Sequence, residues 1–338
     1  MSSRVIAQNL VNPWDLAYGA DNNIYFTERL GTISRINLAT NVITKMITLP
    51  DVSVRATGGL LGLCLHPQFP TQPYLYATYF YKKVSTGKYT QKVVRFTVSG
   101  AKLINPFVVI DNISSGVPTH HGSRLLINNN FMYITTGDGG GLADGMSAQD
   151  LHVLVGKVLR VNLDGTIPST NPIAGSPIWT YGFRNSQGLV AANNRIYSAE
   201  HGPDNDDEIN IIEKNRNYGW PVVNGYCDLS NETNFCSVHN IKQPIKAWTP
   251  TIAPCGLEYY PATGSIAQWR GSLLLCTLKN ERLMQLKLSA DGSGITETKE
   301  YFTNTYGRLR DICISPKGTV YLCTDNDIND KIIEITPQ

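Results

Sequence analysis

Short β-type runs recur as sets along the chain, and this repeat constrains the fold more than any other feature. An early set reads PWDLAYGADNNIYFTERLGTISRINLATN, and a late set reads RLRDICISPKGTVYLCTDNDINDKIIEITP. Both sets contain an apolar strand, a turn with Asn, Asp or Gly, an alternating second strand and a third strand after another turn. Helical periodicity is scarce between them, so the sequence predicts an all-β protein.

Six such sets follow one another at spacings of roughly 45 to 70 residues, which is typical of a β-propeller with four-stranded blades. We therefore expect residues 1–338 to form a single six-bladed β-propeller domain of antiparallel blades. The first strand, near RVIAQNL, is expected to complete the last blade, because a closed ring leaves few exposed strand edges. Two stacked β-sandwiches would use the same strands but would not explain the repeat.

Composition excludes several classes of partner. The formal net charge is +2, from 29 basic and 27 acidic residues, so the chain lacks the basic balance that broad nucleic-acid binding needs. No run of about 18 apolar residues occurs, so no helix is expected to span a membrane. The start, MSSRVIAQNL, has no long apolar segment of the kind found in signal peptides.

The seven cysteines show no CxxC spacing, which argues against a zinc site or a thioredoxin-type motif. Four of them lie in apolar runs and are expected to be small buried hydrophobes: Cys64, Cys276, Cys313 and Cys323. Cys227 and Cys236 flank a polar loop and are candidates for a disulfide. The odd total gives no clean disulfide framework, so this pairing stays open at the level of sequence.

Polar and cationic residues stand near corresponding starts and ends of the repeated sets. Those that share this placement are His120, Arg184, Asn185, Thr251, Lys279, Arg308 and Arg310. Taken alone, a strand-end arginine is more often a solvated or structural ion pair, and a lone histidine more often has no special role. Four cations and a histidine at matched positions together indicate an anionic ligand at one mouth of the ring.

One loop concentrates negative charge in a chain that is only 17% charged. The segment SAEHGPDNDDEIN, residues 198–210, holds five carboxylates: Glu200, Asp204, Asp206, Asp207 and Glu208. It lacks the twelve-residue spacing and central glycine of an EF-hand. On its own it is therefore interpreted as a solvated acidic turn.

Taken together, HHGSRL, YGFRNSQGL and EHGPDNDDEINII…NYGWP resemble the soluble quinoprotein glucose/sorbosone dehydrogenases, in particular their aldose sugar dehydrogenase branch. The similarity covers nearly the whole chain. It implies a six-bladed propeller that uses pyrroloquinoline quinone (PQQ) and calcium to oxidise an aldose to a lactone. It also implies a sugar substrate, an external electron acceptor, a periplasmic or extracellular location, and a monomer or homodimer.

The resemblance assigns roles residue by residue. His120 matches the general base that takes the proton of the anomeric hydroxyl, and Arg184 matches the arginine over the quinone carbonyl. The positions that match cofactor contacts are Asn185, His201, Thr251, Lys279, Arg308 and Arg310. Because PQQ carries three carboxylates, the cations among them are expected to bind those groups.

The acidic loop acquires a second interpretation from the same resemblance. The main-chain carbonyls of Gly202 and Pro203 match ligands of a catalytic calcium, which would act as a Lewis acid. A second, structural calcium site is implied at Glu208, Tyr218, Asn224 and Asp228, with Tyr218 and Asn224 offering main-chain oxygen.

Two positions depart from the family pattern. Relatives carry Glu or Gln beside the cofactor where this chain has Thr57, and one branch has Asp directly before the base where this chain has Thr119. An acid beside an imidazole fixes its tautomer and raises its basicity, so its absence at position 119 would weaken catalysis or reflect the other branch. The substituted positions keep an alternative open, a catalytically inactive propeller used for binding or structure. A calcium-dependent propeller hydrolase ranks lower, because the matched positions are cationic.

Overall fold

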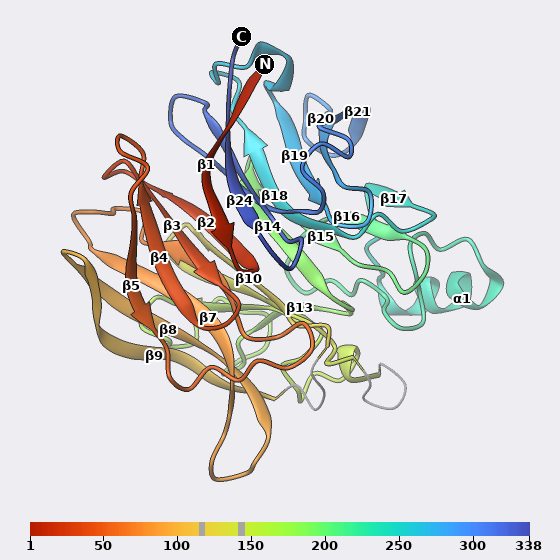
Figure 1. Ribbon diagram of the computed structural model, residues 1–338. Coiled ribbons are helices and arrows are strands. Elements are labelled where there is room, and N and C mark those ends of the chain that lie inside the picture. The colour runs from red at the N-terminus through yellow and green to blue at the C-terminus, as the bar shows by residue number, and fades with distance from the viewer. Residues whose placement is uncertain (115–118, 141–145) are drawn as a thin grey trace.

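The computed structural model describes residues 1–114, 119–140 and 146–338. Within these ranges the strands form six four-stranded antiparallel sheets, arranged around a centre as the blades of a propeller (Figure 1). The predicted all-β, six-bladed fold is confirmed. No helix in the described part of the chain is long and apolar enough to cross a membrane.

Five blades take their four strands consecutively from the chain. The first three are β2 (Pro13–Gly19), β3 (Asn23–Glu28), β4 (Thr32–Asn37) and β5 (Ile43–Thr48); β6 (Leu60–Leu65), β7 (Tyr74–Lys82), β8 (Tyr89–Ser99) and β9 (Lys102–Ser114); and β10 (Gly122–Asn128), β11 (Phe131–Thr136), β12 (Lys157–Asn162) and β13 (Ile178–Tyr181). The next two are β14 (Ser186–Ala192), β15 (Arg195–Glu200), β16 (Asp207–Ile211) and β17 (Lys246–Trp248); and β18 (Pro254–Tyr260), β19 (Ser272–Thr277), β20 (Arg282–Leu288) and β21 (Ile295–Tyr301). Short 3₁₀ turns occur at Met146–Ala148 and Ala267–Trp269.

The sixth blade joins the two ends of the chain. It combines β22 (Leu309–Ile314), β23 (Val320–Thr324) and β24 (Asp330–Thr336) with the N-terminal strand β1 (Ser2–Leu10). Strand β1 runs antiparallel to β24, with Ser2 opposite Thr336, and the two termini lie together in Figure 1. The last blade therefore obtains its outer strand from the start of the chain.

The first strand of each set is the innermost strand of its blade, and neighbouring inner strands contact one another around the ring. The Asp311 carboxylate accepts a hydrogen bond from the Leu16 backbone N–H (2.7 Å), and Asp15 accepts one from Leu63 (3.0 Å). In both cases the third residue of one inner strand meets the fourth residue of the next. Inner strands therefore run in the same direction, and the residues that precede them gather at one mouth.

Paired asparagines explain why several hairpins turn so tightly. Asn129 and Asn130 join β10 to β11, and Asn193 and Asn194 join β14 to β15. All four have positive φ, between 51° and 62°. Two-residue hairpins need this left-handed backbone, which asparagine tolerates better than most residues.

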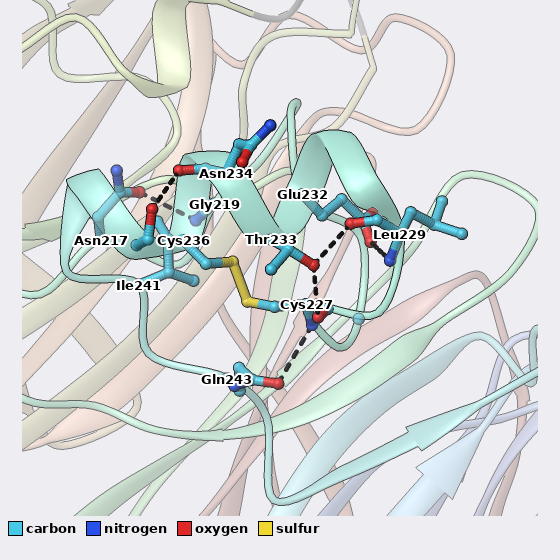
Figure 2. The surroundings of a disulfide bond; sticks show 12 residues. Asn217, Gly219, Cys227, Leu229, Glu232, Thr233, Asn234, Cys236, Ile241 and Gln243 are labelled. Carbon is cyan, nitrogen blue, oxygen red and sulfur yellow. Dashed lines mark hydrogen bonds between the residues drawn. A yellow bond between two sulfur atoms is a disulfide. The ribbon is translucent and has the colours of Figure 1, made fainter.

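Helix α1 (Ser230–His239) lies outside the blade pattern, on the connection between β16 and β17 (Figure 1). Cys227 and Cys236 form a disulfide that ties the helix to the chain before it (Figure 2). The Glu232 carboxylate accepts a hydrogen bond from the Leu229 N–H (3.1 Å), and the helix ends at Asn240 with φ 53°. The pairing that the sequence left open is therefore present, whereas the helix was not predicted.

The other five cysteines carry free thiols. Cys276, Cys313 and Cys323 are buried, as predicted, and so is Cys255. Cys64 is only half-buried, because it lines a cavity at the end of the channel.

Candidate active site

The matched strand-end residues come together at one mouth of the ring. The inner strands β10, β14, β18 and β22 begin one to three residues after His120, Arg184, Thr251 and Arg308 respectively. Arg310 lies one residue inside β22. Lys279 and His201 follow β19 and β15, whose ends pair with the starts of β18 and β14. Because the blades share one topology, residues at matched sequence positions lie at the same mouth of the ring.

His120 forms a hydrogen bond with a carboxylate that sequence analysis did not single out. Its Nδ1 lies 2.8 Å from Oδ1 of Asp138, and the imidazole is 24% exposed whereas Asp138 is buried. The backbone N–H of Gly140 donates to the same Oδ1 (2.7 Å), and the indole N–H of Trp220 donates to Oδ2 (2.8 Å). The carboxylate is therefore held by fixed donors on both oxygens.

His120 has an acidic partner, although it does not come from position 119. Thr119 does take the position where a branch of the family has Asp, and its hydroxyl lies 3.5 Å from the Gly140 carbonyl oxygen. The acid comes instead from the partner strand, because Gly122 pairs with Thr136 across β10 and β11. Extending that register two residues outward places Asp138 opposite His120. The Asn129–Asn130 turn alone would set Gly139 opposite His120, and a register shift between Gly122 and Leu125 brings Asp138 there instead.

Backbone strain and close packing hold His120 in place. His120 has φ 52°, a left-handed conformation that is uncommon for residues other than glycine and recurs at functional sites. A Cβ at Gly137 would collide with the His120 carbonyl oxygen, and one at Gly140 would collide with the Thr119 hydroxyl. The glycines around Asp138 therefore permit the close approach of this loop to the base.

Arg184 and Asn185 are fixed through their backbones. Oε1 of Glu200 accepts both of their N–H groups, at 2.8 and 2.5 Å. Burial raises the pKa of Glu200 well above its usual range, and its Oε2 has no hydrogen-bond partner among the described residues. The Asn185 side chain accepts the Gly122 N–H (3.1 Å), so it links the fourth blade to the segment that carries His120.

His201 is neutral at physiological pH. Burial, followed by the charges of Arg310 and Arg184, lowers its pKa to about 3. Its carbonyl accepts a hydrogen bond from the Arg184 guanidinium (3.3 Å), and its buried Nε2 has no hydrogen-bond partner within the described ranges. His201 therefore lies within the electrostatic influence of both arginines, and one of its ring nitrogens is buried without a hydrogen-bond partner among the described residues.

The remaining cations differ in how far protein groups already neutralise them. Arg310 donates to Asp325 Oδ2 through Nε and Nη2 (3.0 and 2.5 Å) and to Gln187 (2.7 Å). Burial alone would lower the pKa of Arg310, but the Asp325 carboxylate outweighs it and raises the pKa. The Nε–H group of Arg308 donates a hydrogen bond to the Asp325 backbone carbonyl (3.0 Å).

Lys279 is the most accessible of the predicted cations. It is exposed, and its ammonium donates to the Thr251 hydroxyl (2.8 Å), so these two predicted cofactor contacts lie side by side. Thr57 is also exposed, one residue before the buried Gly58.

The acidic loop divides into a buried and an exposed part. Asp207 is buried and accepts backbone N–H groups from Gly202 (2.8 Å), Ile252 (2.5 Å) and Ala253 (2.7 Å), whereas Asp204 is exposed. Asp207 thus folds the loop against the start of the fifth blade. The description of the whole run as a solvated turn was wrong for Asp207, Glu208 and Glu200, all of which are buried.

The carbonyls of Gly202 and Pro203, implied as calcium ligands, accept no hydrogen bond from the described part of the chain. Glu208 lies beside Asn224, because its Oε1 accepts the Gly225 N–H (2.8 Å), and burial raises its pKa to about 7. Tyr218 is buried, with its hydroxyl on the Ile211 carbonyl, and Asp228 is exposed. No cluster of three or more His, Cys, Asp or Glu side chains suited to a metal occurs within the described ranges.

Arg124 closes the channel beneath the mouth. Its Nη1 contacts Asp15 (2.7 Å) and Asp311 (2.9 Å), and its Nε donates to the Gln187 carbonyl (2.9 Å). All three charged side chains are at least nine-tenths buried. Below this layer a cavity of about 620 Å³ lies along the far halves of the inner strands, with Glu258 in its wall.

The chain has relatives along its full length. The family described as Glucose / Sorbosone dehydrogenase matches residues 10–333. Quinoprotein glucose dehydrogenase B of Acinetobacter calcoaceticus is 31% identical, over 95% of this chain and 85% of that protein, and aldose sugar dehydrogenase YliI of Escherichia coli is 28% identical, over 99% and 92%. The structure of PQQ-bound aldose sugar dehydrogenase from Streptomyces coelicolor has a TM-score of 0.82 and 28% identity, covering 98% of each chain.

Proposed function

This chain belongs to the glucose/sorbosone dehydrogenase family, and on that premise we propose that it oxidises aldose sugars at the anomeric carbon to lactones. The quinoprotein and PQQ-bound relatives support PQQ as its cofactor. When bound, PQQ would accept the hydride that leaves the anomeric carbon. Electrons would then pass to an external acceptor.

The His120–Asp138 pair carries the proposal. A carboxylate on Nδ1 fixes the tautomer with its proton on that nitrogen, so the Nε2 lone pair is left to accept a proton. A neutral imidazole with a free ring nitrogen is the side chain that most often serves as a general base. His120 therefore takes the proton of the anomeric hydroxyl, and Asp138 stabilises the imidazolium that forms.

The other residues of the mouth fit a cofactor with three carboxylates. Lys279 and Arg308 are accessible cations, and Arg184 lies beside His201, whose buried Nε2 lacks a protein partner among the described residues. Asp325 already neutralises part of the Arg310 charge. Arg310 is therefore expected to orient a carboxylate of the cofactor more than to supply net positive charge. Asn185 and Thr251 add polar contacts.

Calcium is part of the proposal as an ion that main-chain oxygen atoms bind. The carbonyls of Gly202 and Pro203, which accept no hydrogen bond from the described residues, have the chemistry that this hard cation prefers. A second ion is proposed at Glu208 and Asn224, which already adjoin, together with Tyr218 and Asp228. To bind the ion, the Glu208 carboxylate would have to give up hydrogen bonds that it now accepts from amide N–H groups.

A test is reconstitution of purified protein with calcium and PQQ, followed by reduction of an artificial electron acceptor with several aldoses. His120→Ala should lower kcat about 10²- to 10⁴-fold and leave PQQ binding within about twofold. His152→Ala is the matched control, because His152 is exposed and is not one of the predicted site residues. If PQQ fails to bind at micromolar concentration, the inactive binding module is favoured instead.

The disulfide between Cys227 and Cys236 supports a location outside the cytoplasm. Disulfides persist in oxidising compartments and are rare where thiol reductants are maintained. We therefore place the proposed reaction in the periplasm or outside the cell, with the protein acting as a monomer or homodimer.

A further inference from the structure

Trp220 touches both halves of the proposed catalytic site. Its indole N–H donates to Asp138 Oδ2 at 2.8 Å, on the oxygen that does not contact His120. The guanidinium carbon of Arg184 lies 5.5 Å from the centroid of the Trp220 ring, within the range of a cation–π contact. One side chain thus contacts the partner of the proposed base and the arginine proposed to stabilise developing charge.

The geometry at Asp138 gives the indole N–H a specific task. Oδ1 receives the Gly140 N–H and faces His120 Nδ1, so it is the oxygen that sets the histidine tautomer. Oδ2 accepts its hydrogen bond from Trp220 among the described residues. Without that donor the carboxylate can rotate about its terminal torsion, which is broad and roughly two-fold.

Trp220 is itself anchored at its backbone. Its N–H donates to the Gly182 carbonyl (3.1 Å), and its carbonyl accepts the Gln149 side-chain amide (2.6 Å). Gln149 also exchanges two hydrogen bonds with the Asn217 amide, at 3.0 and 2.7 Å. The indole is therefore held from both the third and the fourth blade.

We propose that Trp220 is a positioning residue: its N–H orients Asp138 so that His120 keeps its proton on Nδ1, and its ring supports Arg184. The first effect concerns the protein's own residues and holds without cofactor. The consequence for turnover rests on the proposed function. The two effects use different parts of one side chain, so they can be separated.

The first experiment measures the His120 tautomer in the cofactor-free protein by ring-¹⁵N NMR, with His120→Ala to assign the signal. Trp220→Phe removes the N–H and keeps an aromatic ring beside Arg184. Wild type should show the Nδ1–H tautomer, and Trp220→Phe should shift a substantial fraction to Nε2–H. Asp138→Ala, which removes the acceptor, should show the same shift and verifies the sensitivity of the signal.

Trp179→Phe is the matched control. Trp179 also has an arginine over its ring, Arg160 at 4.5 Å, but it lies on β13 and donates no hydrogen bond to a carboxylate within the described part of the chain. This variant should leave the His120 tautomer unchanged. A His120 tautomer that is unaltered in Trp220→Phe, or altered equally in Trp179→Phe, overturns the proposal whatever the enzyme assay gives.

The second experiment separates the two effects in PQQ-loaded enzyme. Trp220→Phe should lower kcat about tenfold while the Kd for PQQ stays within about twofold, because second-sphere partners of a reactive group typically contribute 10- to 100-fold. Trp220→Ala should in addition weaken PQQ binding about tenfold, since Arg184 loses its support. Equal PQQ affinities in the two variants would refute the role of the ring. Absence of PQQ binding in wild type would refute the proposed function and leave the NMR result standing.

Discussion

Replacing Arg124 by Met should strongly lower the unfolding free energy of the propeller, although Arg124 is not one of the residues proposed to bind a ligand. The Arg124 guanidinium contacts the Asp15 and Asp311 carboxylates at 2.7 and 2.9 Å, and the three side chains are 7%, 4% and 3% exposed. Through these carboxylates it connects to the backbones of Leu16 and Leu63 on neighbouring inner strands. Arg124→Met keeps an aliphatic chain of similar length but removes the charge.

The expected loss is about 3 to 5 kcal/mol of unfolding free energy, the usual cost of removing one partner from a buried ion pair. It should also depend on pH. Burial raises the pKa of Asp15 and of Asp311, and Arg124 opposes that rise. Groups with raised folded pKa values contribute stability at low pH and lose it as pH rises. Without Arg124 the pKa values rise further, so the loss should be larger at about pH 8 than at about pH 5.

Urea unfolding followed by far-UV circular dichroism at both pH values measures this. Arg4→Met is the matched control, because Arg4 pairs with Glu334 at the surface with 59% of its side chain exposed. That change should cost less than about 0.5 kcal/mol. A loss below about 1 kcal/mol for Arg124→Met, or one as small as the control, would refute the assignment of Arg124 as the charge centre of the channel.

Three further predictions concern separate parts of the molecule. Burial, with Asp311 adding to it, raises the pKa of Glu258 to about 8, so the folded state keeps a proton there that the unfolded chain releases. As the pH rises from about 4.5 to 8, Glu258→Gln should therefore gain unfolding free energy relative to wild type, by at most about 1.4 kcal/mol per pH unit. Urea titrations at several pH values measure this difference. Opening the Cys227–Cys236 disulfide by double alanine substitution should cost about 2 to 3 kcal/mol, because the closed loop spans a separation of nine residues, and hydrogen exchange should rise in Ser230–His239 rather than in the blades. Lys279→Met should weaken PQQ binding about three- to tenfold by fluorescence titration, with a smaller effect at high salt; an effect insensitive to salt would contradict a charge contact.

Much of the site could be predicted because the blade repeat is a local pattern. His120, Arg184 and Arg308 were found from their places before inner strands, and identical topology is what brings such places together. Pairing across a hairpin is almost as local, but the Asn129–Asn130 turn alone would set Gly139 opposite His120, and a register shift between Gly122 and Leu125 is what brings Asp138 there. Trp220 could not be predicted either, because 82 residues separate it from Asp138 and no periodicity connects them.

The alternation of apolar and polar residues, repeated six times, was sufficient by itself to determine an all-β ring of blades, because strand period and turn chemistry act over a few neighbouring residues. Which charged side chains are buried away from solvent could be seen from the three-dimensional arrangement alone. Arg124 and Asp207 look in sequence like ordinary polar residues beside strands, yet both are buried and hold neighbouring segments together. Desolvation depends on what the rest of the ring places around a group, and that surrounding is assembled from residues far apart in the chain.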